Sequence, residues 1–565
     1  MVQSIVPPEP SPAALRLLVL PAGVEVAAHR DETVLQALER AGFELVQPCG
    51  GVGLCGKCRV IAEGPTPVPP TVHPHLSEEQ TLLGWRLACQ LRLTGDLAVR
   101  LTGDWHKVPR RRSGSPRTRP DRLGSVDAVA AASRAAVTDP DGAHAPKGLA
   151  LDLGTTTLVA TLVSLGSGVE LATVTLPNPQ ARFGQDVMSR IERGSSPEGL
   201  AELNGAIASA LDAAVSQLCR AARSDRRDIT DVVVGGNPAM LELAAGVDPS
   251  PLGQAPFALG IEGGRDFASQ TFGLSLDPRA RAYVPPITNA FVGSDISAGL
   301  LAAEGFFDGS EPMLFVDIGT NGELVLRASQ SLLATSTAAG PAFEGGGLRC
   351  GMPAVSGAVA SVWVQAGDLV LGSVDGARPR GLCGSGVVDL VAALLELRVV
   401  EASGRMLRAG AAAGVPPAVR DRMGEVSGQP AIFVTEDVVF TQEDVRQVQL
   451  AKGAVRTGID LLLAETVAVR PRLILAGGFG SHLDRRSLAT IGMVPPELAA
   501  DAVVAGNTSR RGCVRLLQAP ALRRELEHRM RGVRYLSLIE RSDYLDRFAA
   551  NMEFFCLPKP TLGVS

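Results

Sequence analysis

The chain has 565 residues, of which 45% are hydrophobic and 20% are charged, so wholesale disorder is excluded and several domains are expected. A net charge of −5, with only three Trp and three Tyr, disfavours a basic nucleic-acid binder and an aromatic platform for single strands. The apolar runs, such as Leu17–Leu20, are far shorter than the roughly 20 residues of a membrane span. We therefore predict neither a nucleic-acid partner nor a membrane anchor.

Residues 14–104 are predicted to form a small α+β domain. The apolar spacing and the turn and capping residues predict, in chain order, strands at 15–20 and 24–28, a helix at 32–41, a strand from 59, a short helix from 77 and a last strand at 97–101. Residues 105–146 differ, because they contain clustered Arg, Ser, Gly and Pro and then an Ala-rich stretch. This composition predicts a flexible linker, although the arginines could instead bind an acidic partner or nucleic acid.

Four cysteines near the start of the chain have the spacing of a metal site. Cys49, Cys55 and Cys58 stand at C-x5-C-x2-C spacing in a Gly-rich loop, and Cys89 follows with 30 residues between it and Cys58. Four thiolates can ligate a [2Fe–2S] cluster, and the glycines let backbone N–H groups reach its sulfurs. A zinc site and unligated buried thiols are the alternatives. The loop resembles that of the adrenodoxin-like β-grasp ferredoxins, which also place five residues between the first two cysteines.

Residues 147–555 alternate strand-like and helix-like segments, which is typical of an α/β domain. Within them, the apolar strands that contain Asp152 and Asp317 each lead into Asp-x-Gly-Thr and then into a second strand. The two copies lie 165 residues apart, which is far beyond a solenoid period. This spacing predicts a duplicated domain in two halves with a cleft between them.

The repeated loops and a later Gly-rich loop carry residues suited to a nucleotide. Gly lets backbone N–H groups approach a phosphate, Thr adds hydroxyl donors, and Asp can hold Mg²⁺ through water or orient the attacking group. The order of the loops resembles the phosphate and adenosine loops of the actin, Hsp70 and sugar-kinase superfamily, which implies a duplicated ribonuclease-H-like ATPase fold. The nucleotide-binding residues implied are Gly154, Thr155, Thr156, Gly319, Thr320, Asn321, Gly477 and Gly478, and the catalytic acids are Asp152, Asp317 and Glu323.

Longer stretches narrow the resemblance, namely 178–191, 236–240, 338–345, 381–386 and 448–454. With the ferredoxin-like loop in front, the chain resembles the reductive activators of corrinoid enzymes over roughly residues 14–555. The resemblance implies ATP-dependent reductive activation of a corrinoid protein, in which one electron from a [2Fe–2S] cluster converts inactive Co(II) to Co(I). It implies that Cys49, Cys55, Cys58 and Cys89 ligate the cluster.

The same resemblance implies ATP and Mg²⁺ as cofactors, a corrinoid protein or cobalamin-dependent methyltransferase as partner, a separate electron donor and a homodimer. The N-terminus does not have the pattern of a signal peptide, and together with the oxygen-sensitive chemistry this predicts a cytoplasmic protein. Three acids, Glu323, Asp186 and Glu344, lie beside motif loops and could orient water, or could serve only as a cap or an ion pair. Residues 384–386 are predicted either to face a phosphate or to begin a helix.

Two other functions stay open at this point. A redox-sensing kinase of the sugar-kinase superfamily needs a carboxylate base, for which Asp186 or Glu344 could serve. An electron-transfer protein without ATP coupling needs only the iron–sulfur domain on a nucleotide-binding scaffold. A phosphorylated product would indicate the kinase, and electron delivery that does not respond to ATP would indicate the uncoupled carrier.

Overall fold

The structure is a computed structural model that describes the chain except for residues 1–14, 21–22, 29–31, 42, 46–57, 64–75, 77, 102–104, 108–138, 143, 185, 330, 467–469, 478–482 and 556–565. The chain divides into two compact units. Unit 1 comprises Met1–Leu123 with Gln180–Gln185, and unit 2 comprises Gly124–Pro179 with Asp186–Ser565. Each unit is described by itself below.

Unit 1 contains a five-stranded sheet in the order β2-β1-β6-β4-β5. Its strands are β1 (Leu15–Leu20), β2 (Val24–Ala28), β4 (Arg59–Glu63), β5 (Trp85–Leu87) and β6 (Leu97–Leu101), and its helices are α1 (Val34–Arg40) and α2 (Glu78–Leu82). β1 pairs with β2 as a hairpin and with β6 in parallel. Alternate apolar residues of the strands and one face of α1 form a buried core. The predicted elements of this domain are therefore confirmed.

The predicted linker is wrong at its first residues. Trp105–Lys107 form strand β7, which pairs antiparallel with β3 (Phe43–Leu45). The composition pattern did not detect this pairing, because the two three-residue strands lie far apart in the sequence. The prediction is also wrong at the other end, since Asp139 forms a 2.7 Å ion pair with the fully buried Lys147 in unit 2. The central part of the predicted linker, residues 108–138, lies outside the described residues.

The first half of unit 2 is built on a six-stranded sheet in the order β10-β9-β8-β11-β13-β12. The strands are β8 (Lys147–Leu153), β9 (Thr157–Ser164), β10 (Glu170–Pro177), β11 (Ile229–Gly236), β12 (Arg265–Ala268) and β13 (Arg281–Val284). Strand β8 is buried along its whole length. It pairs antiparallel with β9 on one side and in parallel with β11 on the other.

The second half repeats this plan in the order β24-β23-β14-β15-β16-β25. The strands are β14 (Met313–Ile318), β15 (Gly322–Ala328), β16 (Ser331–Thr337), β23 (Arg472–Ala476), β24 (Val503–Gly506) and β25 (Val533–Tyr535). Strand β14 pairs antiparallel with β15 and in parallel with β23, as β8 does with β9 and β11. The predicted duplication is therefore confirmed, and both Asp-x-Gly-Thr motifs follow equivalent central strands.

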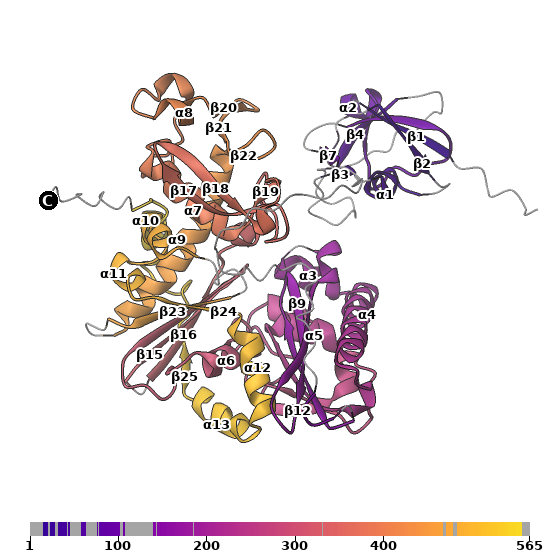
Figure 1. The fold of residues 1–565 in the computed structure, drawn as a ribbon, viewed down its shortest axis with the longest axis vertical. Helices are drawn as coiled ribbons and strands as arrows, with labels where there is room; N and C mark the ends of the chain where they lie inside the picture. The colour runs from indigo at the N-terminus through magenta and orange to yellow at the C-terminus, as the bar shows by residue number, and fades with distance from the viewer. Residues whose placement is uncertain are drawn as a thin grey trace, which may run out of the picture. The chain divides into compact units, whose positions relative to one another are not determined.

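Helices α6 (Ser294–Ala302) and α12 (Thr508–Gln518) pack side by side between the two sheets (Figure 1). Their apolar faces share one core with residues of both sheets, including Val233 of β11 and Phe315 of β14. The N-terminal ends of both helices therefore belong to the region where the two halves meet. Further helices of this unit, outside the insert described next, are α3 (Val187–Gly194), α4 (Pro197–Ala222), α5 (Pro238–Ala245), α10 (Arg485–Thr490), α11 (Pro496–Ala499), α13 (Ala521–Met530) and α14 (Tyr544–Asn551).

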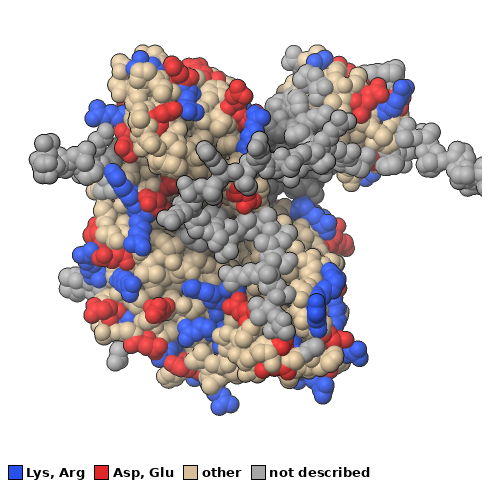
Figure 2. Space-filling model, in the orientation of Figure 1, with Lys and Arg blue, Asp and Glu red and all other residues tan. Residues whose placement is uncertain are grey.

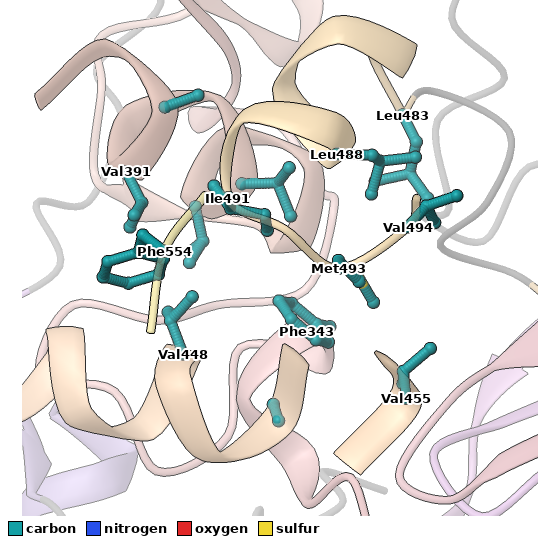
Figure 3. Packing of buried hydrophobic residues seen from close by; sticks show 14 of the residues in the cluster. Phe343, Val391, Val448, Val455, Leu483, Leu488, Ile491, Met493, Val494 and Phe554 are labelled. Carbon is teal, nitrogen blue, oxygen red and sulfur yellow. The ribbon is translucent and has the colours of Figure 1, made fainter. Parts of the chain in front are cut away.

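An insert between β16 and β23 carries two small sheets and two long helices. Its elements are β17 (Ala358–Gln365), β18 (Asp368–Ser373), β19 (Gly381–Leu382), α7 (Gly384–Glu396), α8 (Pro417–Arg420), β20 (Met423–Val426), β21 (Gln429–Phe433), β22 (Val439–Thr441) and α9 (Gln442–Ala464). Phe343, Val448, Ile491 and Phe554 lie together in its large core (Figure 3). This core continues into the second sheet, so the insert is packed onto the second half.

The surface carries both signs of charge. Figure 2 shows acidic and basic side chains interspersed over the visible face, in keeping with a net charge of only −5. Within the described ranges, no helix combines the length and the apolarity needed to cross a membrane.

Candidate functional site

The first motif loop follows β8 and depends on a close backbone approach at Gly154. Its N–H donates to Thr157 O at 3.0 Å, and a Cβ at this position would lie 2.6 Å from that oxygen. Asn178 Nδ2 donates to Gly154 O at 2.8 Å. Asn237, the N-cap residue of α5, donates from Nδ2 to Thr155 Oγ1 at 3.2 Å. The loop is therefore fixed by side chains of the first half.

Asp152 in β8 is held by the N-terminus of α12. Asn507 Nδ2 donates to Asp152 Oδ2 at 2.6 Å, and Ser509 Oγ donates to Oδ1 at 2.7 Å. Asn507 is also the N-cap residue of α12 and accepts from Arg510 N. Sequence reasoning did not select Asn507 or Ser509. An Asn after a strand that ends in glycine is a recognisable capping signal, but it does not reveal the distant Asp152.

The second motif loop follows β14 and is hydrogen-bonded to a residue that follows β16. Gly319 N donates to Asn321 O at 2.9 Å. Thr320 Oγ1 donates to Glu344, which lies in the short helix η5 (Pro341–Glu344). Burial raises the pKa of Glu344, and the nearby hydroxyls of Thr320 and Thr156 act in the opposite direction. Glu344 is therefore hydrogen-bonded to the second motif loop and lies near the first.

The loop after β23 approaches the second motif at Gly477. Gly477 has φ of +101°, and its N–H donates to Gly506 O at 3.1 Å. A Cβ here would lie 2.6 Å from Ile318 O and 2.8 Å from Asp317 Oδ1. Gly477 therefore lies directly against the second aspartate, and the predicted Gly478 lies outside the described residues.

Buried carboxyls gather where the two halves meet. Burial and the neighbouring carboxylates raise the pKa of Asp317 to about 8 and of Asp295 to about 7. The same causes raise the pKa of Glu323 well above its usual range, and burial raises that of Asp152. Glu323 lies directly opposite Asp317 in the sheet register. Sequence reasoning missed Asp295, which stands in the first turn of α6 behind Gly293.

This set of acids suits a divalent cation held jointly by protein, water and phosphate. Buried carboxylates of like charge favour a proton or a cation in their midst. No three His, Cys, Asp or Glu side chains among the described residues converge closely enough to hold a metal ion by themselves. A cation such as Mg²⁺ usually takes only one or two carboxylates, together with substrate phosphates and several waters.

In unit 1, Cys58 and Cys89 meet at the start of β4 and the end of β5. Their Sγ atoms lie 3.3 Å apart, and Ala88 N donates to Cys58 O at 2.8 Å. Two sulfurs on one tetrahedral metal with bonds of about 2.3 Å lie about 3.8 Å apart, so the pair fits one metal centre. The hydrogen bond with Cys89 lowers the pKa of Cys58 to about 6, which favours the thiolate. The predicted Cys49 and Cys55 lie outside the described residues.

Two other predicted positions have structural contacts. Asp186 is the N-cap residue of α3 and accepts from Ser189 N at 2.8 Å, which supports its role as a cap. Residues 384–386 begin α7, and Ser385 Oγ donates to Ala360 O of β17 at 2.7 Å. A Cβ on Gly386 would lie 2.0 Å from Val359 O, so this turn packs on the strand as a helix start.

Comparisons with known families match three consecutive regions. Residues 18–94 match the 2Fe-2S iron-sulfur cluster binding domain. Residues 147–305 match the RACo middle region, and residues 311–559 match the C-terminal domain of RACo, the ASKHA domain. The predicted fold class is confirmed, as are an iron–sulfur domain and a nucleotide-binding fold.

Among the proteins that are similar to the chain are two relatives and one solved structure. Corrinoid activation enzyme RamQ of Eubacterium limosum is 33% identical over 362 residues, which are 62% of this chain and 60% of that enzyme. The [Co(II) methylated amine-specific corrinoid protein] reductase of Methanosarcina barkeri is 27% identical over 404 residues, 64% of this chain and 68% of that protein. The structure of a reductive activator for corrinoid, iron-sulfur protein matches with a TM-score of 0.66 and 26% identity, covering 96% of this chain and 98% of that one.

Proposed function

We propose, from the premise that this chain belongs to the RACo family, that it is an ATP-dependent reductive activator of a corrinoid protein. One electron from its [2Fe–2S] domain would convert inactive Co(II) to Co(I). The names of the similar proteins, which describe corrinoid activation and the reduction of a Co(II) corrinoid protein, support this function. The main observation in favour of this function is that unit 2 contains two Asp-x-Gly-Thr loops. In the sequence, they follow a cysteine motif for an iron–sulfur cluster.

The cluster would be ligated by Cys49, Cys55, Cys58 and Cys89. When bound, it supplies a site that accepts and releases single electrons. Within the protein, the buried thiols Cys58 and Cys89 supply two adjacent sulfurs, and the lowered pKa of Cys58 favours its ligating form.

The nucleotide would bind where the two halves meet. Backbone N–H groups and hydroxyls of 154–156 and 319–321 would hold the phosphates, and Gly477 with Gly478 would face the adenosine. Asp152 and Asp317 would hold Mg²⁺ through water, and Glu323 would orient the attacking water. The raised pKa of Asp317 supports this assignment, because a nearby cation would stabilise its ionised form.

The family resemblance implies that the Co(II)/Co(I) couple lies below typical [2Fe–2S] ferredoxins, which have potentials of about −400 mV in the plant type. Electron flow to cobalt is then uphill. A change of conformation driven by ATP could alter the ligation or surroundings of the corrinoid and so make the transfer favourable. We assign the protein to the cytoplasm, where free thiols stay reduced, and infer a corrinoid-dependent methyltransferase as partner and a homodimer as the assembly.

An anaerobic assay tests this function. The reduced protein is mixed with a Co(II) corrinoid methyltransferase, and the Co(I) absorption band is followed with and without ATP. We expect Co(I) only with ATP, at a rate roughly 100-fold lower in Asp317→Asn. The exposed Glu198→Gln in α4 is the matched control and should retain the wild-type rate.

Other outcomes would point elsewhere. Co(I) that forms equally without ATP would indicate an uncoupled electron carrier. A phosphorylated small-molecule product, without any Co(I), would indicate a kinase.

A further inference from the structure

Glu344 connects parts of the fold that are far apart in the sequence. Its carboxylate accepts a hydrogen bond from Thr320 Oγ1 in the second motif loop and lies near the Thr156 hydroxyl of the first. A Cβ on Gly319 would lie 3.7 Å from Glu344 Oε1, so the carboxylate lies against the second loop itself. One acidic side chain is thus bonded to one proposed phosphate loop and lies near the other.

A hydroxyl group has a single hydrogen to donate. Thr320 directs that hydrogen to Glu344, yet the same hydroxyl is a proposed donor to a nucleotide phosphate. It cannot donate to the carboxylate and to a phosphate oxygen at once. An ionised Glu344 and a phosphate in contact would also repel each other. The Glu344 carboxyl group and a phosphate are therefore competitors for Thr320.

A buried cation gives Glu344 a second source of stabilisation. Burial raises the pKa of Glu344, whereas the guanidinium of the fully buried Arg190 in α3 favours its ionised form. Burial lowers the pKa of Arg190 to about 10, so it is still charged at neutral pH. Glu344 would keep this electrostatic partner when its hydrogen bond from Thr320 breaks.

The helix that carries Glu344 is anchored to the insert. Phe343 and Ala342 of η5 are buried in the core shared with α7 and α9 (Figure 3). Gly345, which ends η5, has φ of +81°, and a Cβ there would lie 2.6 Å from the backbone of Met352. Because η5 is fixed to the insert, breaking the bond between Thr320 and Glu344 would release the insert from the second motif loop.

We propose that the Glu344 carboxyl group is an internal acceptor that competes with nucleotide phosphate for Thr320, and that its displacement transmits nucleotide binding to the insert. This proposal rests on the nucleotide site of the proposed function and deepens it. It makes Glu344 a positioning residue that regulates the site, rather than one that holds the nucleotide.

Nucleotide titration of the holoprotein, without any corrinoid protein, tests the competition. The dissociation constants of Mg·ADP and Mg·ATP are measured by calorimetry for wild type, Glu344→Ala and Glu344→Gln. We expect Glu344→Ala to bind about tenfold more tightly, the effect of removing one competing hydrogen bond. Glu344→Gln keeps an acceptor oxygen and should gain less. Glu396→Gln, the same change at an exposed position of α7 in the insert, should bind as the wild type does.

A double-mutant cycle separates competition from simple removal of a negative charge. Thr320→Val removes the shared hydroxyl with little change in shape. If Glu344 competes for the Thr320 hydroxyl, the gain from Glu344→Ala shrinks several-fold in the Thr320→Val background. An undiminished gain in that background would overturn the proposal. Equal or weaker nucleotide binding by both folded Glu344 variants would overturn it as well.

Hydrogen exchange of residues 339–347 tests the link to the insert. Saturating Mg·ATP should change the exchange of this segment in the wild type and should not do so in Glu344→Ala. An unchanged segment in nucleotide-saturated wild type would contradict the link. Neither readout involves cobalt, so a protein that passes these tests but never forms Co(I) would refute the corrinoid function and leave the inference about Glu344 intact.

Discussion

Gly477 is a single residue on which the geometry of the second motif depends. Its φ of +101° suits glycine, and a Cβ would lie 2.6 Å from Ile318 O. We expect Gly477→Ala to lower the free energy of unfolding of unit 2 by about 1–3 kcal/mol and to weaken nucleotide binding, because the backbone must shift against Asp317. Denaturant unfolding and calorimetry measure the two effects.

Gly205 offers a matched control for this substitution. It lies inside α4, and a Cβ there would have no heavy atom within 4 Å. Gly205→Ala should therefore raise stability by up to about 1 kcal/mol through helix propensity. Equal stabilities of Gly477→Ala and the wild type would show that the close approach at Gly477 is not needed.

Glu242 predicts a pH dependence that is separate from the nucleotide site. It is fully buried in α5, where its Oε1 accepts from Gly260 N at 2.7 Å. Burial raises its pKa from the usual 4.5 to about 7. The folded protein thus holds this proton more tightly than the unfolded chain does. Its contribution to stability is complete below about pH 4.5 and is lost as the pH rises through about 7.

Glu242→Gln removes this titration and keeps an acceptor. We expect its melting temperature to exceed that of the wild type by a few degrees at pH 8, with a smaller difference at pH 5. The measurement is a series of thermal unfolding scans between these two pH values. Glu262→Gln, at an exposed side chain, is the control and should follow the wild-type curve. Parallel curves for Glu242→Gln and the wild type would contradict the assignment.

Sequence patterns around single residues predicted part of the candidate site. Asp152 and Asp317 were identifiable because each stands in a local pattern of an apolar strand followed by Gly-Thr. Asn507 could not be assigned to the site, since its bond to Asp152 spans 355 residues. Asp295 carried no repeated motif, and only the packing of α6 between the sheets brings it to the other acids.

At the scale of elements, the N-terminus of α12 stabilises its helix and also positions a site residue. Asn507 caps the helix through Arg510 N and donates to Asp152 Oδ2. Asn507→Ala should cost about 1 kcal/mol of stability through the lost cap and also slow ATP hydrolysis, because Asp152 loses a partner that fixes its carboxylate. Denaturant unfolding and a phosphate-release assay measure the two effects.

A second cap separates these effects. Ser196 caps α4 by accepting from Gly199 N at 3.1 Å, and it makes no contact with a predicted site residue among its described hydrogen bonds. Ser196→Ala should lose similar stability and keep the wild-type rate of hydrolysis. If both variants hydrolyse ATP at the wild-type rate, the bond from Asn507 to Asp152 has no role in the reaction.

The elements of unit 1 were predictable where local periodicity or turn chemistry decides them. The hairpin of β1 and β2 and the helix α1 follow from alternating or helically spaced apolar residues. Strand β7 was not predictable, because three residues beside an Arg-rich stretch form a strand only by pairing with β3, about 60 residues away. Asp139 likewise gained its order from the buried Lys147 and not from its own neighbours.

At the scale of the whole molecule, the duplicated plan was predictable because both halves kept the same strand-and-loop motif. The insert between β16 and β23 was not, since its small sheets have no counterpart in the first half. Among the described residues, one core is formed within unit 1, and the large cores are formed within unit 2. A variant in one unit can therefore be measured with the other unit as an internal reference.

This separation leads to a prediction for a variant without the cluster. Cys58→Ser removes one of the two adjacent thiols in unit 1. We expect loss of the visible absorption of the cluster and of Co(I) formation, with the dissociation constant of Mg·ATP unchanged within about twofold. Cys219→Ser in α4 of unit 2 is the control and should retain the cluster. Absorption spectra and calorimetry provide the measurements.

Linkage makes this test informative about how ATP is used. If ATP acts on the corrinoid partner and not on the cluster, loss of the cluster cannot change the affinity for ATP, because coupling between two sites is reciprocal. The same reciprocity requires that a Co(II) corrinoid partner change the affinity for ATP, in Cys58→Ser as much as in the wild type. If Cys58→Ser binds ATP more weakly than the wild type does in the absence of the corrinoid partner, ATP and the cluster are coupled within the protein. ATP would then act on the cluster, before the electron reaches cobalt.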